Sequence, residues 1–239
     1  MSKLTDNYST TSTNISVENY DFKVREKILY LKENILNRIT LKKDAVILDI
    51  GCGWGGSLSA FRDCGYDNLY GFDQSKEQID YAKTQGKLEN VIVSDALEYL
   101  KSTTQTFDLI TMFDVLEHLE NDYAVELLGL INQRLNSGGQ LVIQVPNGIT
   151  LIQAYLFSDI THIRSYTSLS LAQVFKSTGF YDYNFFESSL VAITLKQKIA
   201  KICLNLIFKP LTMFYILSLT GSKFGSIYTA NIIAITTKN

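Results

Sequence analysis

Five short apolar runs alternate with polar stretches of helical period, and this alternation constrains the fold most strongly. The apolar runs have strand length and cover residues 45–50, 68–73, 90–95, 107–114 and 140–145. Helical patterns lie at 57–64, 76–84, 122–135 and 169–177. Strands that alternate with helices form βαβ units, in which a crossover helix joins two parallel strands. The middle of the chain is therefore predicted to be an α/β domain with a mostly parallel sheet.

The two flanks complete the predicted domain organisation. Apolar residues recur at three- and four-residue steps over 17–39, which predicts an amphipathic helix. The preceding residues 1–16 are rich in Ser, Thr and Asn, so we expect them to be mobile or to fold over a ligand. Two more strands are predicted over 180–187 and 228–237. We interpret residues 1–40 as a lid segment and 41–239 as the main domain, with an insertion at 188–228.

Charge and cysteine content exclude several classes of function. The 22 Lys and Arg residues against 24 Asp and Glu residues give a net charge of −2, so the whole chain lacks the basic field that non-specific nucleic-acid binding needs. The three cysteines form no even set, which favours a reducing compartment, and the N-terminus lacks the pattern of a signal peptide. The cytoplasm is the predicted location. With only two histidines, no metal site is predicted.

A glycine-rich turn follows the first predicted strand. Residues 46–56 read as a buried strand, a tight turn and the start of a helix. Gly51, Gly53 and Gly56 match the G-x-G-x-x-G dinucleotide fingerprint, with Asp73 about 20 residues further on. Read alone, this motif leaves a nicotinamide-dependent oxidoreductase open as an alternative.

Three acids stand at or just before the carboxyl ends of neighbouring strands. Asp49 precedes the first glycine of the turn by two residues, Asp73 ends the second strand and Asp95 ends the third. Doubly wound sheets bind their ligands beyond the carboxyl ends of the strands. The three carboxylates are therefore predicted to face one ligand site.

Five motifs in order resemble those of the class I S-adenosylmethionine-dependent methyltransferases. They are Asp49-x-Gly51-x-Gly53-x-Gly55, the strand end 70–75, the turn 93–97, the segment 107–119 and the segment 138–147. The resemblance implies a Rossmann-like, doubly wound, mostly parallel seven-stranded sheet with helices on both faces. It places the apolar helical insertion between the last two strands and implies S-adenosyl-L-methionine as cofactor.

The same resemblance assigns positions to the cofactor. Asp49 and the Gly51–Gly53 backbone would flank its methionyl part, and Asp73 would accept hydrogen bonds from both ribose hydroxyls. The full predicted set is Asp49, Gly51, Gly53, Asp73, Gln74, Asp95, Ala96 and Phe113. Asp95 and the Ala96 amide would contact the adenine, and Phe113 would lie near the sulfonium.

The two histidines are candidates for a catalytic base. A hydroxyl acceptor must lose its proton as it attacks, and imidazole is suited to take it near neutral pH. His162 lies in Asp159-Ile-Thr-His162, after the fifth strand, where this superfamily places acceptor-binding elements, and it is the predicted catalytic residue. His118 belongs to Asp114-Val-Leu-Glu-His118, which in relatives is a turn at the mouth of the cofactor pocket.

The insertion differs from the rest of the chain in charge. Residues 188–239 contain six lysines and no acid, and 199–219 show an amphipathic helical pattern. The longest uncharged run, 210–222, begins with a proline and is too short to span a membrane. Three interpretations remain open, namely a helix lying on anionic lipid, a dimer interface or lid, and core packing.

The favoured function is methyl transfer to a small-molecule or sugar-linked acceptor, at oxygen, in polysaccharide or secondary-metabolite biosynthesis. The basic insertion suits an acceptor that carries a phosphate or a nucleotide. The predicted partners exclude nucleic acid and include a second copy of the chain and peripheral contact with a membrane. The alternatives are a lipid or quinone methyltransferase at the membrane surface, the oxidoreductase, and a cofactor-binding subunit without catalysis.

Overall fold

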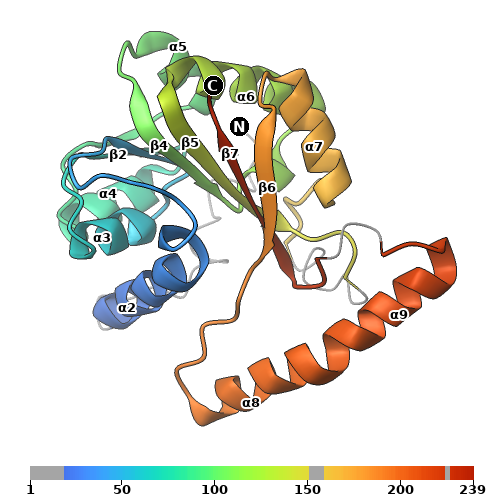
Figure 1. The fold of residues 1–239 in the computed structure, drawn as a ribbon. Coiled ribbons are helices and arrows are strands. Elements are labelled where there is room, and N and C mark those ends of the chain that lie inside the picture. The colour runs from blue at the N-terminus through green and yellow to red at the C-terminus, as the bar shows by residue number, and fades with distance from the viewer. Residues whose placement is uncertain (1–18, 151–158, 224–226) are drawn as a thin grey trace.

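A seven-stranded sheet forms the centre of the computed structural model, which describes residues 19–150, 159–223 and 227–239 (Figure 1). The strands are β1 (Ile47–Ile50), β2 (Leu69–Asp73), β3 (Val91–Val93), β4 (Phe107–Phe113), β5 (Leu135–Pro146), β6 (Asp182–Glu187) and β7 (Asn231–Thr237). Their order across the sheet is β3-β2-β1-β4-β5-β7-β6, and only β7 runs antiparallel to its neighbours. The predicted doubly wound, mostly parallel sheet is confirmed.

Helices cover both faces of this sheet (Figure 1). The α-helices are α2 (Tyr20–Leu31), α3 (Gly56–Asp63), α4 (Lys76–Thr84), α5 (Ala96–Ser102), α6 (Asn121–Arg134), α7 (Ser168–Ser177), α8 (Leu195–Cys203) and α9 (Lys209–Thr220). Short π-helical segments η2 (Lys32–Leu36) and η5 (Leu204–Phe208) and the 3-10 turn η3 (Leu116–His118) complete the described elements.

The two faces of the sheet have separate cores because successive strand residues point to opposite sides. In β1, Leu48 and Ile50 pack into the cluster that includes Leu127 of α6 and Phe175 of α7. Ile47, the residue before Leu48, points to the other side and packs into the cluster on the other face, with helix α3. Both faces of the central strands β1 and β4 are buried, which explains why these strands read as continuous apolar runs.

The N-terminal helix packs against the second of these cores. It begins at Tyr20 and continues as η2, so it is close to the predicted 17–39. The hydroxyl of Tyr20 lies 2.8 Å from Ser59 Oγ on α3, and Leu31 and Ile35 are fully buried. Residues 1–16, predicted to be mobile or to cover a ligand, lie outside the described residues.

The sequence pattern did not predict one helix and predicted one strand too short. Helix α5 has seven residues and lies within a stretch that carries no long apolar period. Strand β5 starts at Leu135, five residues before the predicted run, because its first part pairs with β4 through a register shift between Phe107 and Leu109.

The insertion is present between β6 and β7, as predicted. It forms one continuous helical segment, Leu195–Thr220, of 26 residues, which by length and composition is the one described helix apolar and long enough to cross a membrane. Pro210, expected to stop the helix, instead lies inside the continuous segment, directly after the π-helical η5. A proline in a helix interior removes one main-chain hydrogen bond, and the π-helical turn before it is the local departure from α-helical geometry.

Candidate active site

A cleft opens beyond the carboxyl ends of β1, β2 and β4, the edge where doubly wound sheets bind ligands. Its volume is about 1350 Å³, enough for a nucleoside cofactor together with an acceptor. Among the predicted site residues, those that line it are Asp49, Gly51, Gly53, Asp73, Gln74, Ala96 and Phe113. The fold thus brings residues from three strand ends and the glycine turn to one cavity.

The glycine turn can be built only with residues that lack a side chain. Gly51 and Gly53 have φ angles of +67° and +50°, in the left-handed region that favours glycine. A Cβ on Gly51 would lie 2.5 Å from Val115 Cγ2. The backbone of the turn is therefore exposed to the cleft at close range, which is the requirement for a ligand that approaches main-chain groups.

Asp73 is held by amides from both sides. The amide of Gly53 donates to Oδ2 at 2.9 Å, and the amide of Ser75 donates to Oδ1 at 2.8 Å. Burial raises the pKa of Asp73, and these amide hydrogen bonds oppose the rise. Each carboxylate oxygen can accept a further hydrogen bond, so the pair of oxygens suits a vicinal diol.

Asp49 lies at the floor of the cleft and is buried. Its Oδ1 accepts a hydrogen bond of 2.6 Å from Thr111 Oγ1 on β4. Burial raises the pKa of Asp49 to about 7, although this hydrogen bond opposes the rise. Its carboxyl group is therefore able to change charge near neutral pH.

Asp95 has a structural position that the sequence reading did not anticipate. It is not among the lining residues, and it caps helix α5, with Oδ1 accepting from the amides of Leu97 and Glu98 at 2.9 and 3.2 Å. Oδ2 accepts from the Tyr123 hydroxyl at 2.6 Å and from Gln74 Nε2 at 3.2 Å. Burial raises its pKa, but these hydrogen bonds together hold the pKa of Asp95 below its ordinary value. The neighbouring Ala96 does line the cleft.

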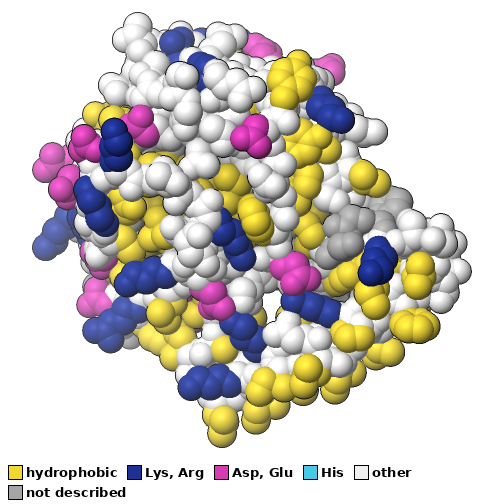
Figure 2. Space-filling view, viewed as in Figure 1, with side chains coloured by type: hydrophobic (Ala, Val, Ile, Leu, Met, Phe, Trp, Pro, Cys, Tyr) yellow, Lys and Arg dark blue, Asp and Glu magenta, His cyan; other side chains and the backbone are white. Residues whose placement is uncertain are grey.

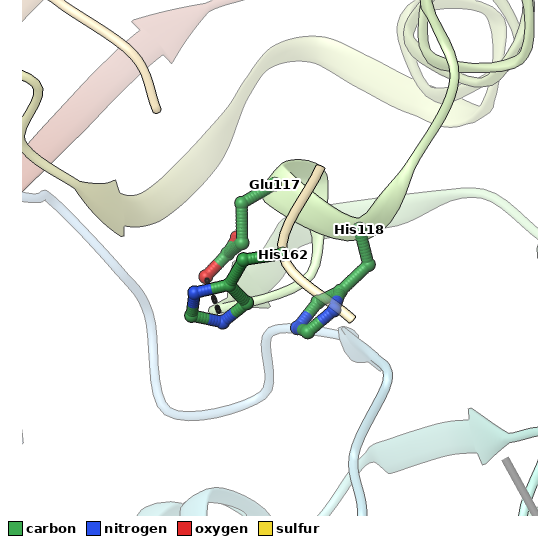
Figure 3. Close-up of side chains that lie close together, drawn as sticks. All are labelled: Glu117, His118 and His162. Atoms are coloured by element: carbon green, nitrogen blue, oxygen red, sulfur yellow. Dashed lines mark ion pairs between the residues drawn. The ribbon is translucent and has the colours of Figure 1, made fainter. Parts of the chain in front are cut away.

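A cluster of one carboxylate and two imidazoles stands beside the cleft (Figure 3). Glu117 and His118 come from η3, and His162 comes from the segment before α7. His162 Nε2 lies 3.8 Å from Glu117 Oε1, and the rings of His118 and His162 contact edge to face with centroids 4.6 Å apart. His118 lines the cleft. His162, the predicted catalytic residue, contacts the His118 ring but is not among the residues that line the cleft.

Burial sets the protonation of this cluster. Glu117 is fully buried, and burial, followed by the nearby Asp114, raises its pKa to about 9. Burial and the neighbouring His162 lower the pKa of His118. At neutral pH Glu117 therefore carries a proton and His118 is uncharged. The Thr161 hydroxyl lies 2.9 Å from His118 Nδ1 and donates to Asp159, which fixes the orientation of the imidazole.

The donor atoms of Glu117, His118 and His162 lie within 4.8 Å of one another, a set that can hold a metal ion. With only two histidines in the chain, no metal site is predicted from the sequence, and the fold brings both of them together with Glu117. Carboxylate and imidazole are ligands for zinc and iron. This set of groups suits an acid–base relay or a metal site.

A second network was not expected from the sequence. Gln144 of β5 donates from Nε2 to both carboxylate oxygens of Asp114, at 2.9 and 2.8 Å, and accepts from the hydroxyl of Tyr30 on α2. Asp114 has a φ of +56°, an unusual value for a residue with a side chain, and it lines the cleft. The only available signal was a polar residue inside the otherwise apolar run 140–145.

Known proteins share this architecture. A chain described as a SAM-dependent methyltransferase from Archaeoglobus fulgidus superposes with a TM-score of 0.63 at 24% identity, covering 98% of each chain. Phosphoethanolamine N-methyltransferase 2 of Haemonchus contortus, solved with S-adenosyl-L-methionine, gives a TM-score of 0.63 at 20% identity, covering all of this chain and 60% of that one. The fold is therefore that of the class I S-adenosylmethionine-dependent methyltransferases.

Sequence comparison gives the family directly. Residues 22–184 match the family model described as "Methyltransferase domain", and the chain belongs to this family, whose cofactor is S-adenosylmethionine. The mitochondrial ubiquinone biosynthesis O-methyltransferase of Candida albicans is 36% identical over 124 residues, which are 48% of this chain and 36% of that protein. A probable (S)-tetrahydroprotoberberine N-methyltransferase of Papaver bracteatum is 33% identical over 93 residues, covering 35% of this chain and 25% of that protein. The chain thus spans about a third or less of these two relatives.

Proposed function

We propose that this chain transfers the methyl group of S-adenosylmethionine to a hydroxyl of a small-molecule or sugar-linked acceptor. The observation that carries the proposal is a half-buried histidine pair beside the buried Glu117, with His118 lining the same cleft as the glycine turn and Asp73. The bound cofactor supplies an electrophilic methyl group that is already activated. The protein then has to align the acceptor, exclude water and receive a proton.

The cleft offers the cofactor a fitting set of groups. The backbone at Gly51 and Gly53 lies open where any side chain would clash or strain the turn, and Asp73 presents two acceptor oxygens. Gln74, Ala96 and Phe113 line the same cavity. We assign Asp49 and the glycine turn to the methionyl end, Asp73 and Gln74 to the ribose, and Ala96 to the adenine edge. Asp95 would act on the adenine indirectly, because it caps helix α5, whose first residue is Ala96.

The proton of the acceptor hydroxyl is assigned to the two histidines. His118 lines the cleft with an uncharged imidazole, and His162 contacts both its ring and Glu117. An uncharged imidazole can take a proton from a hydroxyl, and the His162 ring packed against it holds the His118 imidazole in place. We therefore assign His118 as the group nearest the acceptor and His162 as its catalytic partner.

Lys27 is the side chain that we assign to an anionic group of the acceptor. Two lysines, Lys27 of α2 and Lys76 of α4, line the cleft beside acidic side chains, and Lys76 pairs with Asp80. Ammonium groups bind phosphates well. This supports an acceptor with a phosphate or a nucleotide, in polysaccharide or secondary-metabolite biosynthesis. The cytoplasm stays the predicted compartment. A lipid or quinone acceptor is the second candidate, favoured by the exposed apolar helix of the insertion and by the ubiquinone relatives.

The test uses methyl-labelled S-adenosylmethionine and a cell extract split into water-soluble metabolites and membrane lipids. The proposal predicts labelled product, with the label released under conditions that cleave methyl ethers but not methylamines. Label on nitrogen would contradict O-methylation. Label in neither fraction, despite tight binding of S-adenosylhomocysteine, would favour the cofactor-binding subunit instead.

A further inference from the structure

The helical insertion presents a long apolar surface to solvent. Segments α8, η5 and α9 form one rod that stands off the body of the domain (Figure 1). Along its outer side, Figure 2 shows a nearly continuous row of hydrophobic side chains. We call the exposed apolar side chains of the rod the outer face; those at least half exposed are Leu195, Ile199, Ile202, Leu206, Ile207, Phe208, Leu211, Phe214, Tyr215 and Leu219. Contiguous apolar patches of this kind are rare on proteins that contact only water, and they mark interaction surfaces.

Two ion pairs join the opposite face of the rod to the domain. Lys201 makes an ion pair with Glu33 of η2, and Lys209 makes one with Glu187 at the end of β6. Thr212 is buried on the same side. These contacts fix the rotation of the rod, so the outer face points away from the body and cannot be satisfied by core packing.

The connections of the rod place both of its ends on one side of any bilayer. The rod starts eight residues after β6 ends at Glu187. After the rod ends, the chain is held to the domain again, because Asn147 Nδ2 donates to the carbonyls of Ile227 and Thr229 at 2.9 Å each. Seven residues from Thr220 to Ile227 reach at most about 25 Å when extended, less than the roughly 30 Å of hydrocarbon in a bilayer. A rod held in this way can lie on a membrane but cannot cross it.

The charge around the rod is complementary to anionic lipid. No Asp or Glu occurs in residues 188–239, and Lys196 and Lys198 are exposed in the first turn of α8, with Lys223 exposed just beyond α9. Lysines near an anionic membrane are attracted to its negative surface potential, and salt screens this attraction. An apolar face flanked by lysines is the pattern of helices that lie in the lipid interface.

We propose that the outer face of α8, η5 and α9 docks this protein on an anionic lipid bilayer, with the rod parallel to the membrane. The binding itself is independent of methyl transfer. Docking also has one consequence for the choice of acceptor, and this consequence rests on the proposed function. Strand β6 is parallel to β5, because both are antiparallel to β7, so Glu187 lies at the same sheet edge as the cleft. Docking would therefore hold the cleft edge near the membrane and give access to amphiphilic acceptors.

The experiment is co-sedimentation of the full chain with vesicles of phosphatidylcholine, alone or mixed with phosphatidylglycerol. We expect binding to the anionic vesicles that weakens at high salt. The double variant Leu206→Glu/Phe214→Glu changes two side chains that are 72% and 66% exposed, and should lower the partition coefficient at least tenfold. Tyr181→Glu is the matched control, since Tyr181 is 69% exposed outside the rod and should bind as the wild type does.

Two further readouts separate the outcomes. Thermal protection by S-adenosylhomocysteine should be equal in all variants, so that loss of lipid binding is distinguishable from failure of the methyltransferase site. Light scattering after gel filtration reports the oligomeric state of the same samples. No sedimentation with anionic vesicles would overturn the proposal. So would a stable dimer that the double variant converts to monomers without any lipid binding, because the outer face would then pack on a second copy.

Discussion

At the scale of single residues, the proton relay depends on His118 and His162. Replacing either with Asn preserves size and polarity but removes the proton acceptor. Loss of a general base typically lowers kcat by about 100- to 10 000-fold. We expect His118→Asn and His162→Asn to reduce kcat within that range with little change in affinity for S-adenosylhomocysteine. Rates measured across pH should lose the acid limb of the wild-type profile.

A chelator distinguishes the relay from a metal site in the same cluster. An acid–base relay predicts that dialysis against EDTA leaves the rate unchanged. Loss of activity that zinc or iron restores would show that Glu117, His118 and His162 hold an ion, and full activity in both Asn variants would remove them from the mechanism altogether.

Gly51 tests the glycine turn. Ala at this position would have to adopt a φ of +67° and place its Cβ 2.5 Å from Val115, so Gly51→Ala should lower the free energy of unfolding by about 1–3 kcal/mol. Gly129 lies within α6 with nothing near its missing Cβ, so Gly129→Ala should raise stability by about 0.5–1 kcal/mol. Urea unfolding of both variants measures the contrast. Equal effects would contradict the strained geometry of the turn.

At the scale of elements, Asp95 acts as the cap of α5. Asp95→Ala removes the acceptor for two orphan amides and should cost about 0.5–2 kcal/mol of unfolding free energy. Asp95→Asn keeps that acceptor and should retain most of the stability. Urea titration compares the three chains. An Asn variant as unstable as the Ala variant would mean that the carboxylate charge, not the cap, is what the position needs.

The elements also show what a sequence pattern can and cannot predict. The sequence pattern predicted all seven strands, although β5 begins five residues before its predicted run, because central strands buried on both faces leave a continuous apolar signal. The strand-end reasoning placed Asp49, Asp73 and Asp95 at one sheet edge, and of these Asp49 and Asp73 line the cleft whereas Asp95 caps α5. Helix α5 was missed because a seven-residue helix has fewer than two full periods to display.

Contacts between distant segments could not be predicted from the hydrophobic pattern of the sequence. In the sequence Glu117 looks like an ordinary turn acid, and only the fold places it beside His162. Gln144 looks like a polar residue in an apolar strand, and only the fold shows its hydrogen bonds with Tyr30 and Asp114. The position of His162 behind His118 likewise depends on how the segment after β5 folds back. Such contacts arise from packing, which local periodicity does not encode.

At the scale of the whole molecule, buried carboxyl groups link stability to pH. Glu117 has a pKa of about 9 in the folded chain against an ordinary 4.5 when unfolded, so between these values the folded state binds more protons. Stability must then fall as pH rises through this window, by at most about 1.4 kcal/mol per pH unit for one group. Asp49 adds to the fall only below its pKa of about 7.

Glu117→Gln isolates this contribution. The amide is neutral at every pH and nearly the same shape, so the variant should lose less stability than the wild type between about pH 7 and pH 9, where His118 no longer titrates. Urea unfolding at both pH values measures the two slopes. Identical slopes in both chains would mean that Glu117 is ionised in the folded protein.

We assign the cleft to S-adenosylmethionine, which the glycine turn and Asp73 would hold. Titration calorimetry with S-adenosylhomocysteine tests this assignment most directly, in the wild type, in Asp73→Asn and in the exposed control Asp63→Asn. Losing a charged acceptor for two hydroxyls should weaken binding about 10- to 100-fold in Asp73→Asn, while the control binds as the wild type does. Heat from NAD and none from S-adenosylhomocysteine would contradict the account and restore the oxidoreductase reading of the glycine motif.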